Sequence, residues 1–330
     1  MLTAPTSLDI AKAQLQAAMA DLREAFLSSL DVADSSRAFY GRATTQYLAW
    51  LEQTGRSLEN ITAADILRYK EDLLSRQPQA KAPGKASALP QQNRLSSLTV
   101  SSYLAAVRRF YSWAESMKLY QDVAKGIRSP KREQKFRRQP LTPGQARDLL
   151  AYYQARDPRD YAIVSLLLRA GLRTVELTRA DIQDLKLLGG QRVLLIQGKG
   201  HTDKDSFVVL TEKAYQPIMA YLETRKDTRL SDPLFISESN NSKGQRLTTR
   251  KISQVAKDGL RAIGLDERAF TAHSLRHTTA VSILRAGGSL EDAQLTLRHR
   301  SPATTQIYTH TLNEQRRLER SGESLIDSLY

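Results

Sequence analysis

The sequence predicts a mainly α-helical protein with one small β element, divided into two domains. Apolar residues recur at helical spacing within residues 47–51, 61–74 and 100–113, and the first 127 residues show no strand-like alternation. Two short β-branched stretches follow, at residues 192–197 and 206–210, and they predict a hairpin with a long exposed tip. A length of 330 residues also agrees with two domains of ordinary size.

The boundary between the two domains is predicted at residues 128–140. This segment has two prolines, few apolar residues and no periodicity, which is typical of an extended linker. We therefore expect a helical domain at residues 1–127 and a second domain at residues 141–330. Within the first domain, the Pro, Gly, Ala and Ser content of residues 77–97 predicts a long loop.

Capping signals predict where the helices of the second domain begin. Thr142, Pro143 and Gln145 supply an N-cap, a first-turn proline and a capping-box residue directly after the linker. Further helices are predicted to begin at Thr211, at Thr248 or Thr249, at His273 and at Ser289. Ser301 and Pro302 predict a last helix, which contains Tyr308.

Composition excludes several classes of protein. The chain has no cysteine, so disulfides, thiolate nucleophiles, iron–sulfur clusters and cysteine-based zinc sites are excluded. The longest apolar run, residues 161–168, is far shorter than the ~18 residues of a membrane-spanning helix. The amino-terminal stretch mixes charged residues among alanines and leucines, unlike a signal peptide. We expect a soluble, cytoplasmic protein associated with the bacterial nucleoid.

The charge balance indicates a polyanionic partner. The formal net charge is +14, and the predicted linker alone holds six basic residues against one acidic residue. A solvated face or a loose linker is the alternative interpretation of such a run. The predicted DNA-contacting residues are two arginines on the third helical stretch and five basic residues of the linker: Arg108, Arg109, Lys131, Arg132, Lys135, Arg137 and Arg138.

The histidines gather near the carboxyl end, four of the five lying between residues 273 and 310. A metal site at His273 and His277 is disfavoured, because Ser274 stands where a zinc protease would have a catalytic Glu. Phosphoryl transfer explains the pattern better. His273 and Arg276 project from one helix face as a proton carrier and a phosphate clamp. Gly171 ends an apolar helix and is expected to hold Arg173 at a turn.

Five motifs then occur in a fixed order: Gly171-Leu172-Arg173 with Glu176-Leu177, Gly198-Lys199-Gly200, His273-Ser274-Leu275-Arg276-His277, Leu297-Arg298-His299 and Tyr308-Thr309-His310. Together they resemble the motifs of tyrosine recombinases of the phage integrase and Xer type. Residues 99–111 resemble, more loosely, the family's helical, SAM-like core-binding domain. The resemblance implies that this domain and a mixed α/β catalytic domain form a C-shaped clamp around DNA.

The resemblance also implies a role for each motif residue. Tyr308 is the nucleophile, and Arg173 and Arg276 hold the phosphodiester. Lys199 donates a proton to the departing 5′ oxygen, His273 assists as acid or base, and His299 binds the phosphate. Glu176 and His277 support them. No metal and no cofactor is implied, because one phosphoester is exchanged for another through a 3′-phosphotyrosine.

Several alternatives stay open at this point. Tyr308 is also compatible with an ordinary helix aromatic, and Lys204 is an alternative to Lys199 as the proton donor. Arg298 stands where the family usually has glycine, which leaves the placement of His299 open. The leucine-bearing tail after Tyr308 is expected to dock on a neighbouring subunit, with packing on its own domain as the alternative.

The implied partners are a specific recombination site on double-stranded DNA and three further copies of the chain, forming a tetramer on two duplexes. Integration or excision of a mobile element and Xer-like resolution would use the same chemistry. Two competing functions are a monomeric type IB topoisomerase-like enzyme and a non-catalytic helical DNA-binding protein.

Overall fold

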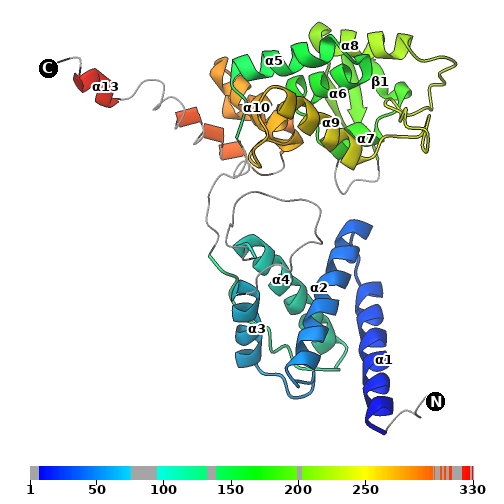
Figure 1. Cartoon of the computed structure of the whole chain (residues 1–330), viewed down its shortest axis with the longest axis vertical. Helices are drawn as coiled ribbons and strands as arrows, with labels where there is room; N and C mark the ends of the chain where they lie inside the picture. Colours follow the sequence, from blue (N-terminus) through cyan, green and yellow to red (C-terminus); the bar gives the residue numbers. More distant parts are fainter. Residues whose placement is uncertain are drawn as a thin grey trace. The chain divides into compact units, whose positions relative to one another are not determined.

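The computed structural model describes residues 7–75, 95–131, 139–198, 203–299, 301, 305–306, 308–309, 312–313, 322–327 and 329. The chain divides into two compact units, residues 1–135 and 136–330 (Figure 1). The mainly helical architecture with one small sheet confirms the predicted fold class. The domain bounds at 127 and 141 stay a prediction, and most of the loop predicted at 77–97 lies outside the described residues.

The first unit consists of four described helices: α1 (Ser7–Ser28), α2 (Asp34–Gln53), α3 (Ala63–Ser75) and α4 (Ser97–Ser116). Aromatic side chains fill its core. Phe26 of α1 is fully buried and meets Phe110 of α4 edge to face at 5.5 Å. The hydroxyls of Tyr47 and Tyr111 share a buried hydrogen bond of 2.8 Å, which satisfies two polar groups that burial would otherwise leave unpaired. The core therefore depends on large rings that α2 and α4 contribute together.

Two cations hold the end of the first unit, where the predicted linker begins. The Arg108 guanidinium donates to the Ile127 carbonyl at 2.9 Å and to the Ser129 hydroxyl at 3.1 Å. Lys70 donates to the Arg128 carbonyl at 3.0 Å. These bonds join residues 127–129 to α3 and α4.

The second unit contains α5 (Pro143–Gln154), α6 (Pro158–Arg169), α7 (Thr174–Arg179), a 3₁₀ turn η1 (Ile182–Asp184), β1 (Leu185–Leu188), β2 (Gln191–Ile196), β3 (Ser206–Val209), α8 (Glu212–Glu223), α9 (Thr249–Ala262), α10 (Ala272–Arg285), α11 (Leu290–Leu297) and α13 (Gly322–Asp327). The strands form an antiparallel sheet in the order β1-β2-β3. Leu194 of β2 pairs with Leu185 on one side and with Val208 on the other. The sequence predicted β2 and β3 but not β1, which carries no β-branched residue and is largely exposed.

Helix α6 is the centre of the second unit. It contacts α5, α8, α9 and α10, and residues 162–167 are all fully buried. Asp157 caps its start by accepting from the Asp160 backbone N–H at 3.0 Å. A helix that is apolar on nearly every side must be covered by others, and these four helices pack around it (Figure 1).

The first residues of the second unit are bound to the α10 region. The Leu141 backbone N–H donates to the Thr278 hydroxyl at 2.8 Å, and the Gln139 N–H donates to the Ala269 carbonyl at 3.3 Å. The capping box that the sequence predicted at Thr142 is present directly afterwards. The chain therefore enters the unit along α10 before it turns into α5.

Helices α5 and α9 approach each other closely at Gly259. A Cβ at this position would lie 2.7 Å from the Leu149 Cδ1 and would also overlap the ring of Tyr153. The Tyr153 hydroxyl donates to the Val255 carbonyl at 2.6 Å, which fixes the ring against α9. Glycine is needed here for space, because two helices with larger facing residues pack farther apart.

We predict that Gly259→Ala lowers the free energy of unfolding by about 1–3 kcal/mol, the usual cost of overpacking a filled core. Thermal unfolding followed by circular dichroism measures the change. Gly144→Ala is the matched control, because the nearest atom to its added Cβ is the Thr142 Oγ1 at 3.8 Å. The control should be as stable as the original protein or slightly more stable. Equal destabilisation by both substitutions would contradict the close approach.

Candidate active site

Gly171 creates the turn that presents Arg173. Its φ of +57° is left-handed, and a Cβ there would lie 2.6 Å from the Leu297 Cδ2. The chain reverses and Arg173 becomes the N-cap residue of α7. Its backbone N–H donates to Glu176 Oε2 at 2.7 Å, and its Nη1 donates to Glu176 Oε1 at 2.6 Å. The sequence-based placement of Arg173 at a turn is confirmed.

Helix α10 supplies the second arginine. The Thr271 N–H donates to the Ser274 hydroxyl at 3.1 Å, which places the start of the helix one residue before the predicted His273. Arg276 is only 1% exposed, and its guanidinium donates to the carbonyls of Gly171 and Leu297. It therefore joins α10 to the turn before α7 and to the end of α11.

Arg173, His273 and Arg276 line one pocket of about 480 Å³. The side chain of Arg173 is 31% exposed and His273 is exposed, whereas Arg276 reaches the pocket from the buried side. Lys257 also lines the pocket, but its ammonium donates to backbone carbonyls of the loop between α9 and α10, those of Asp266, Glu267 and Phe270. Two guanidiniums and an imidazole around one cavity are suited to an anion of the size of a phosphate.

Tyr308 lies in a buried cluster next to this pocket. It is helical and 3% exposed, and it packs with Ala280, Val281, Leu297 and Leu312. The His277 ring meets the Tyr308 ring edge to face at 5.0 Å, and the His299 ring lies almost parallel to it at 6.1 Å. His273 in turn contacts His277 at 4.8 Å. The structure thus brings together residues from three of the predicted motifs around one phenol.

The electrostatics of the cluster favour a bound anion. Burial raises the pKa of the Tyr308 phenol, and Arg276 and Arg173 act in the opposite direction. Burial, and then Arg276 and Arg173, lower the pKa of His299 to about 4, so this imidazole is neutral at neutral pH. Burial and the neighbouring arginines also lower the pKa of Arg276 to about 9, so it remains charged. Cations that repel one another in this way are relieved when an anion binds between them.

Arg298 adopts the backbone conformation that the family glycine would have. With φ at +53° it ends α11 in the left-handed region, and the His299 N–H bonds back to the Gln294 carbonyl at 3.1 Å. The Nδ1 of His299 lies 3.0 Å from the Thr305 hydroxyl. His299 is therefore placed beside Tyr308 despite the arginine before it, which answers the question that the sequence left open.

The structure describes only some of the residues that were predicted to contact DNA. Arg108 donates to the Ile127 carbonyl and the Ser129 hydroxyl, Arg109 lies 5.8 Å from the Tyr40 ring centre, and Lys131 is exposed. The remaining linker cations and the proposed proton donor lie outside the described residues: Arg132, Lys135, Arg137, Arg138 and Lys199. DNA contact by any of these residues stays a prediction.

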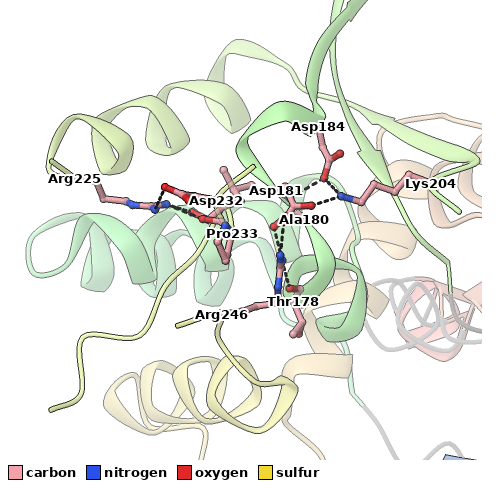
Figure 2. Close-up of polar contacts among 10 residues, drawn as sticks. Thr178, Ala180, Asp181, Asp184, Lys204, Arg225, Asp232, Pro233 and Arg246 are labelled. Atoms are coloured by element: carbon pink, nitrogen blue, oxygen red, sulfur yellow. Dashed lines mark hydrogen bonds and ion pairs between the residues drawn. The ribbon is translucent and has the colours of Figure 1, made fainter. Parts of the chain in front are cut away.

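Lys204, the alternative proton donor, is bound by carboxylates of the segment after α7 (Figure 2). Its ammonium lies 2.6 Å from Asp181 Oδ2 and also bonds Asp184. Arg246 binds the same Asp181 and donates to the Thr178 and Ala180 carbonyls at 2.9 and 3.0 Å. Burial alone would lower the pKa of Lys204, but the two carboxylates outweigh it and raise the pKa, so Lys204 holds its proton. These contacts favour a structural role for Lys204.

No helix in the described part of the chain is long and apolar enough to cross a membrane. Among the same residues, no group of three or more His, Asp or Glu side chains is arranged to hold a metal ion.

The chain is a tyrosine recombinase, one of a class of enzymes that break and rejoin DNA. Residues 139–315 match the family described as the phage integrase family, and the chain belongs to it. The sequence-based resemblance is confirmed.

Relatives and solved structures agree with this assignment. The tyrosine recombinase XerC of Pelobacter propionicus is 35% identical over 211 residues, which cover 63% of this chain and 67% of the relative. The tyrosine recombinase XerD of Vibrio cholerae is 27% identical over 302 residues, 89% and 93% of the two chains. The XerH recombinase, solved in a post-cleavage complex with its difH substrate, has the same fold, with a TM-score of 0.70 at 18% identity over 93% of this chain and 85% of its own.

We predict that His299 titrates near pH 4, well below its ordinary value of about 6.5. The folded protein then binds this proton later than the unfolded chain does, so stability is complete above pH 6.5 and falls between 6.5 and 4. NMR titration of the His299 ring protons measures the pKa directly. His299→Gln should lose less stability over that pH range than the original protein, and an unshifted titration near 6.5 would contradict the buried environment.

We predict that Lys204→Met lowers the free energy of unfolding by about 1–3 kcal/mol, because it leaves Asp184 without its cation. Lys213→Met, at an exposed position of α8, is the control and should change little. The pKa of Asp181 is lowered in the folded state, so the stabilising effect of Lys204 is present at neutral pH and is lost in acid, below the ordinary Asp range. Urea unfolding at pH 7 and pH 3 tests both points.

Proposed function

We propose that this protein is a site-specific recombinase in which Tyr308 attacks a DNA phosphodiester and forms a 3′-phosphotyrosyl link. The observation that carries the proposal is the convergence of Arg173, His273 and Arg276 on one pocket beside the buried Tyr308. The phenol oxygen forms a bond to phosphorus as the bond to the DNA 5′ oxygen breaks. The free 5′ hydroxyl of a second strand later attacks the link and releases the tyrosine.

The two arginines have complementary positions for this reaction. Arg173 is accessible from the pocket, and its partner Glu176 fixes both its backbone and its side chain. Arg276 is held from behind by two carbonyls. A phosphate between them gains negative charge in the pentacoordinate transition state, which fixed guanidiniums stabilise more than they stabilise the ground state. The exchange of one phosphoester for another requires no external energy source.

Proton transfer involves groups on both sides of the phosphorus. The phenol must lose its proton. The His277 ring contacts the Tyr308 ring directly, and the His273 ring contacts His277, so these two imidazoles form a chain of ring contacts that ends at the phenol. We assign the proton for the leaving 5′ oxygen to Lys199 of the hairpin tip. One observation supports this assignment over Lys204: the Lys204 ammonium is already bound to two carboxylates.

Double-stranded DNA is the proposed partner, with the basic linker and Arg109 at its backbone and four copies of the chain on two duplexes. The relatives named above are tyrosine recombinases, and XerH was solved on its difH duplex. The exposed side chains of Ile326 and Leu329 near the end of the chain suit the proposed docking of the tail on a neighbouring copy. Integration or excision of a mobile element and resolution of joined chromosomes both use this chemistry.

The covalent link provides the test. The protein is incubated with a library of random-sequence duplexes, each carrying one nick, so that the short 5′-hydroxyl fragment diffuses away and the link persists. After denaturation, the DNA that remains bound to protein is sequenced. We expect the original protein to retain DNA with one shared sequence, and Tyr308→Phe to bind DNA with affinity within about 3-fold yet retain none, since only one oxygen is removed.

Each other outcome argues against part of the proposal. If the original protein retains no DNA, strand cleavage by this chain is wrong. If Tyr308→Phe retains as much DNA as the original protein, the nucleophile is another residue. If linked DNA shows no shared sequence, the activity is that of a topoisomerase-like enzyme.

A further inference from the structure

Arg298 is the residue of the site for which the family pattern gives no role. It has a left-handed backbone conformation, φ +53° and ψ +49°, which is strained for any residue with a Cβ and is usually left to glycine. An arginine in that position needs a compensating contact from its side chain. The side chain is largely buried, 12% exposed, so the contact lies inside the protein.

The contact is with Glu176. Nη2 of Arg298 lies 2.9 Å from Glu176 Oε2, and Nη1 donates to the Thr296 carbonyl. Arg298 does not line the pocket that Arg173 shares with Arg276. Its positive charge therefore acts on a bound phosphate through the carboxylate and not by touching the phosphate.

Glu176 accepts hydrogen bonds from two guanidiniums and lies at ion-pair distance from a third. It is 1% exposed, with Arg173 Nη1 at 2.6 Å, Arg298 Nη2 at 2.9 Å and Arg276 Nη1 at 4.0 Å. Burial alone would favour the protonated acid, but Arg298 and Arg173 lower the pKa of Glu176, so the carboxylate stays charged. A charged carboxylate this close cancels part of the attraction that Arg173 and Arg276 exert on an anion.

The charges of the cluster show what Arg298 adds. Arg173, Arg276 and Glu176 together carry a net charge of +1, and Arg298 raises it to +2. A phosphodiester carries one negative charge, and its pentacoordinate transition state carries two. The cluster with Arg298 thus matches the transition state, and the cluster without it matches only the ground state.

We propose that Arg298 is a positioning residue that neutralises Glu176, so that Arg173 and Arg276 act on the scissile phosphate with their full charge. The inference rests on the proposed function, since it concerns the same reaction. It also explains the strained backbone. The left-handed conformation at Arg298 directs the side chain onto Glu176, and the ion pair with Glu176 offsets the free-energy cost of that conformation.

The test is a double-mutant cycle of Arg298 and Glu176. Arg298→Gly suits the left-handed backbone, so its melting temperature should stay within a few degrees of the original. Its cleavage rate, measured as protein–DNA link formation on the duplex recovered in the library experiment, should fall about 10- to 100-fold because one unit of positive charge is lost. In Glu176→Gln the amide oxygen still accepts from the Arg173 N–H, and the negative charge is gone.

Combining the two substitutions separates the charge effect from a structural one. Glu176→Gln with Arg298→Gly restores the net charge of +2, so the double variant should cleave at least 5-fold faster than Arg298→Gly alone. A double variant that is as slow as Arg298→Gly, or slower, would overturn the proposal. Cleavage by Arg298→Gly at the rate of the original protein would also overturn it. In either case the original protein still forms the link, so the proposed function stands.

A second substrate keeps the test valid if the double variant fails to fold. A duplex with a methylphosphonate at the scissile position lacks one non-bridging charge, so its transition state carries one negative charge. The rate difference between the original protein and Arg298→Gly should shrink to within about 3-fold on this duplex. An undiminished difference, or cleavage of this duplex by neither protein, would count against a charge-matching role.

Discussion

One buried carboxylate, that of Glu176, holds the site together. It accepts from the backbone of Arg173 and from guanidiniums at the start of α7 and the end of α11, and it lies at ion-pair distance from the guanidinium of Arg276 in α10. The Gly171 carbonyl binds two of the same guanidiniums. Buried ion pairs are costly to assemble, because desolvation offsets most of the attraction. What such a cluster provides is a fixed geometry among elements that lie up to 122 residues apart in sequence.

The same burial determines how the tyrosine behaves. Tyr308 lies among apolar side chains and two imidazoles, and its phenol is held neutral by desolvation. The positive charges of Arg276 and Arg173 act in the opposite direction and make ionisation of the phenol easier. In the proposed mechanism, the same positive charges help the phenol to act as a nucleophile.

Local signals in the sequence predicted much of the fold. Thr142, Thr248 and Ser289 each precede a helix and accept a hydrogen bond from its first turn, as their sequence context indicates. The glycine at position 171, just after the end of α6, likewise predicted the turn that carries Arg173. Helix α1 and strand β1 were not predicted, because α1 has a thin, alanine-rich apolar stripe and β1 has no β-branched residue. Both are held by tertiary contacts, which local propensity does not describe.

The long-range contacts of the site were not predictable from the sequence. The motifs named Arg276 and Glu176, but nothing in their spacing shows that Arg298 reaches the same carboxylate from the far side of α11. The network of Asp181, Lys204 and Arg246 was equally hidden, because its members lie up to 65 residues apart and form no motif. In the sequence, charged residues that pair only after folding cannot be distinguished from charged residues on the solvated surface.

The residues on either side of the linker are hydrogen-bonded to helices, and this has a mechanical consequence. Lys70 and Arg108 hold residues 127–129 to α3 and α4, and Leu141 is bound to Thr278 of α10. Tension along the backbone at residue 141 therefore reaches the helix that carries His273 and Arg276 before it reaches the sheet.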